Sequence, residues 1–179
     1  MRLLLWAGIL GFSFWILSEL LEIYLRGYNP TVYYLTAAYH VFAGFGIWGL
    51  HKAQSGQGRN TLSLVGAAIA FIAYVGVIYF PIAVLNSGLS IAEFLDANPL
   101  YAIPGVLWFV GMLLFGISLL TTRHFPTWSG SVFVLGTIIF TATPLLNGPA
   151  LLANVTNIIF AGTVISLCLM SLGRARANP

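Results

Sequence analysis

A succession of long apolar runs constrains this chain more than any other feature, because most of them reach the roughly 18 residues that indicate a membrane-spanning helix. Hydrophobic residues make up 59% of the 179 residues and charged residues only 6%, whereas soluble domains carry about 25% charged residues. The mean hydropathy is +0.95. This composition excludes a water-soluble globular fold. We expect an all-α polytopic membrane protein with a single transmembrane domain over residues 1–179.

The runs divide into six candidate spans where Gly, Pro, Asn and charged residues interrupt them. The predicted spans cover about 4–25, 31–51, 61–85, 99–122, 129–147 and 150–172. Each span crosses about 30 Å of hydrocarbon at roughly 1.5 Å per residue. Between the last two, we expect a tight turn, because one unbroken helix would be far too long for the bilayer. The available helix breakers are Pro144, Gly148 and Pro149.

The N-terminal segment, MRLLLWAGILGFSFWIL, resembles the basic start and apolar middle of a secretory signal. Its apolar character resumes beyond Glu19, however, and no A-x-A cleavage site follows in time. We therefore expect this segment to be a retained first helix.

The basic residues alternate between loops in the way that the positive-inside rule requires of six crossings. One side of the predicted bundle receives Arg2, Lys52, Arg59, Arg123, Arg174 and Arg176, and the opposite side receives Arg26. All the acidic residues fall toward that opposite side: Glu19, Glu22, Glu93 and Asp96. Both termini are therefore expected in the cytoplasm. The net charge of +3 comes from cations scattered among loops, so we expect no nucleic-acid partner.

The longest outer loop contains NSGLSIAEFLDANP, which predicts a short helix at the outer membrane interface. Ser90 and Glu93 have the spacing of a capping box. Ile91, Phe94 and Leu95 give the predicted helix an apolar side. Pro99 suits a first helical position and should open the fourth span. A weak internal repeat, Phe45-Gly46-Ile47 and Phe115-Gly116-Ile117, further suggests three related helical hairpins with close helix packing.

A cytoplasmic loop at residues 123–130, RHFPTWSG, leads into the fifth span. This loop and the six-span layout resemble a group of small bacterial six-helix inner-membrane proteins in which a basic loop runs into Pro-x-Trp-small-Gly. The resemblance implies a multi-pass location in the bacterial inner (plasma) membrane. The group carries no assigned reaction, so the resemblance transfers no functional residues.

Glu19 is the most informative polar residue, because an intramembrane carboxylate normally faces the bundle interior or a wet cavity. The first two spans form a hairpin whose turn is expected near Asn29. Counting from that turn brings Glu19 and His40 to equal depth, roughly 15 Å into the membrane. We expect the two side chains to meet and to hold or pass a proton. The alternative is a hydrogen bond that only joins two helices.

Other polar residues in the same half of the predicted bundle are candidates to line a pocket around Glu19. They are Tyr74 or Tyr79, Thr141, Asn154 and Asn157. Closer to the boundary, Glu22 and Arg26 are spaced as a helix-surface ion pair with the acid first. For the asparagines, hydrogen bonding between helices is the alternative role.

The sequence offers little for metal, cofactor or catalytic chemistry. Cys168 is the only cysteine, and the three histidines, His40, His51 and His124, lack a nearby carboxylate or cysteine that would complete a zinc site. We expect no metal and no cofactor. No G-x-S-x-G, H-E-x-x-H or Walker loop is present, which makes an enzyme the least supported class.

Two functions are consistent with these residues. The first is a small integral membrane protein that binds or transports a small solute or a proton through an outward-facing polar pocket around Glu19 and His40. The alternative is a non-catalytic accessory or scaffolding subunit of a larger membrane complex, suggested by the short loops. The expected partners are the lipid bilayer and either other membrane subunits or further copies of the chain.

Overall fold

The computed structural model describes residues 1–27, 29–55, 60–122, 124–146 and 148–177, and in this part of the chain the regular structure is helical. Side chains at 144, 145 and 175–177 are not described. The helices are α1 (Arg2–Leu25), α2 (Pro30–Ser55), α3 (Thr61–Val77), α4 (Phe80–Ser87), α5 (Ile91–Ala97), α6 (Ala102–Thr122), α7 (Thr127–Leu145) and α8 (Ala150–Ala177), with a short 3-10 helix, η1 (Pro99–Tyr101).

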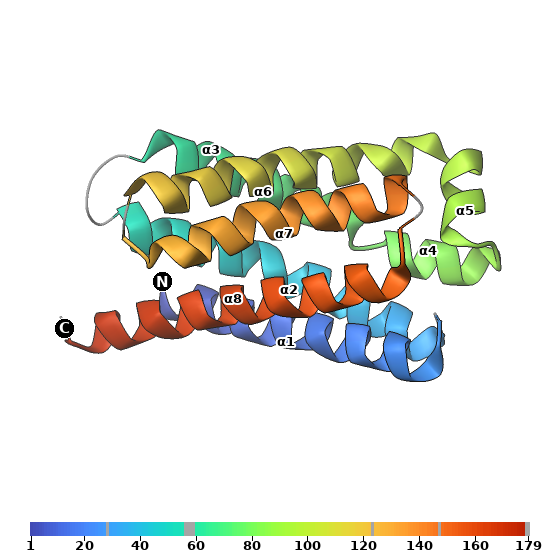
Figure 1. Cartoon of the computed structure of the whole chain (residues 1–179), viewed down its shortest axis with the longest axis horizontal. Coiled ribbons are helices and arrows are strands. Elements are labelled where there is room, and N and C mark those ends of the chain that lie inside the picture. Colours follow the sequence, from blue (N-terminus) through green and yellow to red (C-terminus); the bar gives the residue numbers. More distant parts are fainter. Residues whose placement is uncertain (28, 56–59, 123, 147, 178–179) are drawn as a thin grey trace.

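The long helices lie side by side along one axis, and the chain traverses the bundle back and forth (Figure 1). The two termini lie at one end, which we call the termini end, and α4 and α5 lie at the other, the α5 end. α1 packs against both α2 and α8, α3 packs against α6, and α7 packs against α6 and α8. The first and last helices of the chain are therefore neighbours.

Four helical segments are long and apolar enough to cross a membrane: Arg2–Leu25, Thr61–Ser87, Pro99–Thr122 and Ala150–Arg174. In α7 the apolar helix is shorter, Thr127–Thr143, and α2 is not among these segments. These observations confirm the expected all-helical fold with helices of membrane-spanning length. They also bear out the predicted turn before Pro149, because α7 ends at Leu145 and α8 begins at Ala150.

The third predicted span is not one continuous helix. α3 ends at Val77, and after Ile78 and Tyr79 the chain begins a new helix, α4, at Phe80. Pro81 explains the break, because proline has no N–H to donate to the carbonyl of Val77 and its ring crowds that turn. The segment then extends to Ser87, two residues beyond the predicted limit, where Gly88 ends it with φ at 69°.

The predicted short helix in the longest loop is present as α5, and it has the predicted capping box. The Ser90 N–H donates to Glu93 Oε2 at 2.9 Å, and the Glu93 N–H donates to Ser90 Oγ at 3.3 Å. Hydrogen bonds from the side chain and backbone of Ser90 hold the pKa of Glu93 below its usual value. On its buried side, Phe94 packs against the rings of Phe80 and Tyr101.

Glycine allows the two helices of the first hairpin to approach closely at the termini end. A β-carbon on Gly46 would lie 2.4 Å from the Cα of Gly8, and one on Gly11 would lie 2.9 Å from the backbone nitrogen of Ala43. Any side chain at these glycines would push the helices apart. Toward the α5 end, the same two helices are joined instead by a hydroxyl contact of 2.9 Å between Ser18 and Thr36.

Candidate functional site

Glu19 is buried between α1 and α8, with only 7% of its surface exposed. Its Oε1 atom accepts a hydrogen bond of 2.6 Å from Trp15 Nε1, one turn earlier on α1. It also accepts a hydrogen bond of 2.9 Å from Asn157 Nδ2 on α8. The carboxylate therefore links the first and last helices of the chain, and two neutral donors hold it.

The structure does not place His40 beside Glu19. Facing positions on α1 and α2 pair as 8 with 46, 11 with 43 and 18 with 36, so each pair adds to 54. Residue 35 consequently lies level with Glu19, and His40 lies five positions away, roughly 7.5 Å toward the termini end. There its ring packs against the rings of Tyr39 and Tyr74, with centroids 4.7 and 6.1 Å away.

The turn between α1 and α2 explains why the predicted depth match failed. Counting from Asn29 assumed that the turn is centred there, but Arg26 already ends α1 in the left-handed conformation, with φ 56° and ψ 40°. Asn29 belongs to the start of α2, where its Oδ1 accepts from the Val32 N–H at 3.1 Å. The centre of the hairpin is therefore near Gly27, and every predicted pairing shifts accordingly.

Tyr74 is fully buried and is connected to Glu19 only through other aromatic side chains. Its hydroxyl lies 2.8 Å from that of Tyr39, whose ring stacks on Trp15 at 4.6 Å between centroids. Trp15 in turn donates to Glu19. A continuous row of aromatic side chains thus runs from the carboxylate into the bundle centre, where Phe12 and Phe160 also pack against Trp15.

A small cavity of about 270 Å³ opens at the α5 end between the last turn of α1 and the first turn of α8. Its wall includes Glu22, Arg26 and Asn154. Asn154 is 4% exposed and lies one turn before Asn157, whose Oδ1 atom is buried and has no hydrogen-bond partner among the described residues. The predicted asparagines therefore do face the Glu19 side of the bundle, and the predicted boundary residues form the cavity rim.

Among the described residues, the other two candidates make no hydrogen bond to Glu19 or Asn157. Thr141 donates to the carbonyl of Thr137 in its own helix at 2.9 Å. Tyr79 lies in the break between α3 and α4 and is 60% exposed. Within the described residues, no group of three or more His, Cys, Asp or Glu side chains is placed to hold a metal ion.

Two features of the buried polar network were missed from the sequence. Trp15 is the first, although its position four residues before Glu19 puts both on one helix face. The second is a buried group at the termini end of α2. Gln54 Oε1 accepts from Asn60 Nδ2 at 3.1 Å and from Ser118 Oγ at 3.4 Å. No local spacing pattern would have joined Gln54 to Ser118, which lies 64 residues away in the chain.

Comparison of this chain with family models, with curated proteins and with solved structures found no match. The function is therefore inferred from the arrangement of the residues themselves.

Proposed function

We propose that the protein is a small integral membrane protein that binds a proton at Glu19 and exchanges it through the cavity at the α5 end, as a proton-binding or proton-coupled transport protein. The observation that carries this proposal is the buried Glu19 carboxylate, held by Trp15 and Asn157 beneath a cavity lined by Asn154. A buried ionisable group in a membrane helix is costly and usually serves ion or proton pathways.

The amide of Asn157 suits both protonation states of the carboxyl group. As an ionised group, Glu19 accepts a hydrogen bond from Asn157 Nδ2, as in the structure. As a protonated group, Glu19 needs an acceptor, and the unpartnered Oδ1 of the same amide supplies one after a half-turn of the amide group. Proton binding therefore costs no buried hydrogen bond at this site.

The proposal includes a membrane topology of six crossings in a bacterial inner membrane, with both termini cytoplasmic and the α5 end outward. The shared position of the termini and the apolar helices support it. The charge distribution gives further support, because Arg2 and Arg174 lie at the termini end and Glu22 and Asp96 at the α5 end. In this topology α5 lies at the outer interface, with Phe94 directed into the protein.

The accessory-subunit alternative requires no opening toward Glu19. The cavity favours a binding function over that alternative. It reaches from the α5 end to Asn154, which lies one helical turn from Asn157, the residue that donates to the Glu19 carboxylate.

Trp15 provides a built-in reporter for the test, because its indole N–H donates to the group that is proposed to titrate. Fluorescence of the purified protein in lipid nanodiscs is followed during a pH titration over the range in which the protein stays folded. We expect a titration in the wild type and in Asp96→Asn, and its loss in Glu19→Gln, because Asp96 is an exposed carboxylate of α5 that does not line the cavity. Trp15→Phe identifies the part of the signal that comes from this indole.

Proton movement is measured separately in vesicles that contain a pH-sensitive dye. Glu19→Gln should abolish any proton flux that the wild-type protein supports, and Asp96→Asn should retain it. A Glu19→Gln protein that titrates and moves protons like the wild type would show that the buried carboxylate only joins α1 to α8.

A further inference from the structure

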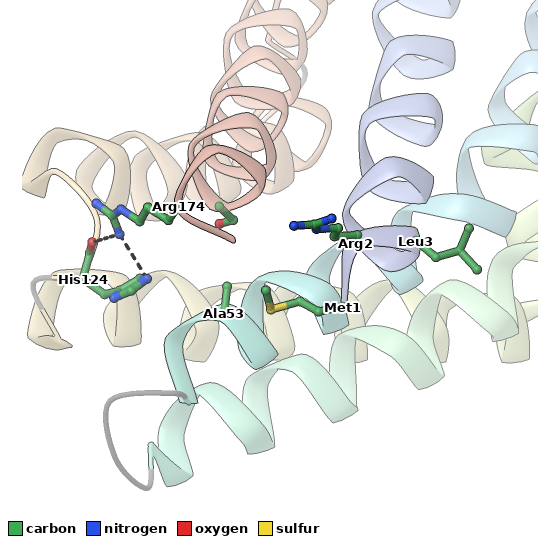
Figure 2. Close-up of a pocket in the computed structure, with 7 residues that line it drawn as sticks. Met1, Arg2, Leu3, Ala53, His124 and Arg174 are labelled. Carbon is green, nitrogen blue, oxygen red and sulfur yellow. Dashed lines mark hydrogen bonds between the residues drawn. The ribbon is translucent and has the colours of Figure 1, made fainter. Parts of the chain in front are cut away.

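A second, larger cavity lies at the termini end of the bundle and is unrelated to the Glu19 site. Its volume is about 700 Å³, within the size range of small-ligand sites. Four separate segments form its wall: the first turn of α1, the end of α2, the loop after α6 and the end of α8. The lining residues are Met1, Arg2, Leu3, Ala53, His124, Ser171 and Arg174 (Figure 2).

The wall of this cavity is cationic. It contains two arginines and one histidine, but no aspartate or glutamate. The carboxylate side chains of the chain are elsewhere: Glu19 and Glu22 lie in the second half of α1, and Glu93 and Asp96 lie in α5. Arg2 on α1 and Arg174 on α8 thus bring positive charge to the cavity, and the described residues that line it include no Asp or Glu. A bound anion is the natural counter-charge for such a wall.

Neutral groups hold the Arg174 side chain in place. One guanidinium nitrogen, Nη1, donates to the backbone carbonyl of His124 at 2.7 Å and lies 3.1 Å from His124 Nε2. The guanidinium also lies over the ring of Phe125, 5.6 Å from its centroid. These contacts restrict the guanidinium without cancelling its charge, and the group keeps further N–H donors for a ligand.

His124 contributes as a neutral acceptor rather than as a cation. Partial burial and, to a smaller extent, the adjacent Arg174 guanidinium lower the pKa of His124 below its usual value. The neutral imidazole can therefore accept from Arg174 at neutral pH. On the opposite wall, the first turn of α1 has no side-chain cap, and the N-terminus of a long helix favours a nearby anion.

We propose that this cavity binds the phosphate group of an anionic ligand, with Arg174 and Arg2 as its principal charged contacts. Arginine is suited to this role because its planar fork makes paired hydrogen bonds to phosphate oxygens. An anionic phospholipid headgroup and a soluble phosphate ester share this chemistry. In the proposed topology the cavity faces the cytoplasmic leaflet, where basic pockets between membrane helices bind acidic lipid headgroups.

The experiment uses the full-length protein in neutral detergent micelles and measures the thermal unfolding midpoint and the bound ligand by native mass spectrometry. The lipid probe is phosphatidylglycerol, compared with zwitterionic phosphatidylcholine. The soluble probe is glycerol 3-phosphate, compared with sodium chloride at equal ionic strength. We expect phosphatidylglycerol, glycerol 3-phosphate or both to bind and to raise the midpoint. Binding of the lipid alone would identify a headgroup site, and binding of both would identify a site for phosphate esters in general.

Arg174→Gln should weaken binding of the probe by roughly tenfold or more, since it removes a charged partner of the phosphate. Arg174→Lys should lose less, because it keeps the charge without the planar fork. Lys52→Gln is the matched control, because Lys52 is exposed at the same end of the bundle but does not line the cavity. If Arg174→Gln fails to fold, Arg2→Gln tests the other wall in the same way.

Two results would overturn the proposal. One is that neither phosphate probe binds more tightly than its control. The other is that Lys52→Gln weakens binding as much as Arg174→Gln, which would mean a diffuse attraction to positive charge rather than a site. Glu19→Gln should leave phosphate binding unchanged, so a failure of the proton site and a failure of this site are distinguishable.

Discussion

The contacts that hold α1 to its neighbouring helices differ between the two ends of the bundle. At the termini end, α1 and α2 touch through Gly8 and Gly46, and charge is gathered around an open cavity. Toward the α5 end, α1 is joined to its neighbours by polar side chains, through Ser18 to α2 and through Glu19 to α8. At the glycine contact the two backbones meet with no side chain between them, whereas near Glu19 the contacts between helices are made by polar side chains. The difference indicates that the ends serve separate roles, and the following changes test that separation.

The largest effect is expected from enlarging the glycine contact. Gly46→Leu places a side chain where a β-carbon alone would lie 2.4 Å from the Cα of Gly8. We expect a loss of about 3 kcal/mol or more in the free energy of unfolding, because the backbone has to move apart. The measurement is reversible unfolding in mixed micelles. Gly162→Leu is the matched control, because a β-carbon there meets nothing within 4 Å, and it should change stability little.

The second largest effect is expected at the α5 end. Asn157→Leu removes one of the two donors to Glu19 and leaves the buried carboxylate with Trp15 alone. We expect a loss of roughly 1–3 kcal/mol at neutral pH, the usual cost of removing a partner from a buried polar group. The loss should shrink in the Glu19→Gln background, since a neutral amide is less costly to bury. An equal loss in both backgrounds would show that Asn157 acts by packing and not through the carboxylate.

These two ends also differ in how far the sequence predicted them. The all-helical fold, the turn before Pro149 and the Ser90 capping box follow from local signals, namely apolar length, helix breakers and caps, and the structure has them. The limits of the predicted spans agree less well, since the third span is divided into α3 and α4. The Glu19 partner does not follow from such signals. Helices that are apolar on all sides carry no amphipathic pattern to show which face meets which neighbour. Depth alone therefore pairs Glu19 with His40 on α2 and gives Asn157 only as a candidate to line the same pocket, whereas in the structure Asn157 on α8 donates directly to Glu19.

The same reasoning explains the other differences between prediction and structure. Pro81 is a helix breaker, but residues 61–85 are apolar over a length that fits one span, so the apolar length alone predicts an unbroken helix there. The distribution of basic residues predicts that Arg2 and Arg174 lie on the same side of the membrane, but it does not predict that they line one cavity. Their shared cavity depends on α1 packing against α8, a contact between the two ends of the chain that no short-range pattern encodes.

A smaller effect is expected from the pH dependence of the termini end. The pKa of His124 is lower in the folded protein than the value of about 6.5 in the unfolded chain, so the unfolded chain binds the proton more readily. Stability from this residue is therefore fully present above the unfolded-chain pKa of about 6.5 and declines as the pH falls from there toward the lower folded pKa. His124→Gln should flatten this part of the curve of unfolding midpoint against pH. If the curve of the variant matches that of the wild type, the pKa of His124 does not differ between the folded and the unfolded chain.

The smallest effect is expected in α5, which has the predicted cap but few packing contacts. Ser90→Ala removes the Oγ acceptor of the Glu93 N–H and also a hydroxyl donor to the Glu93 side chain. Loss of such a cap usually costs about 1 kcal/mol, and here the loss should be confined to the short helix. Hydrogen exchange should therefore accelerate at the α5 amides and remain unchanged in α1 and α8. Ser87→Ala is the control, because its Oγ bonds near the end of α4 and does not cap α5. If Ser90→Ala also accelerates hydrogen exchange at amides around Glu19, then α5 and the carboxylate site unfold together as one cooperative unit.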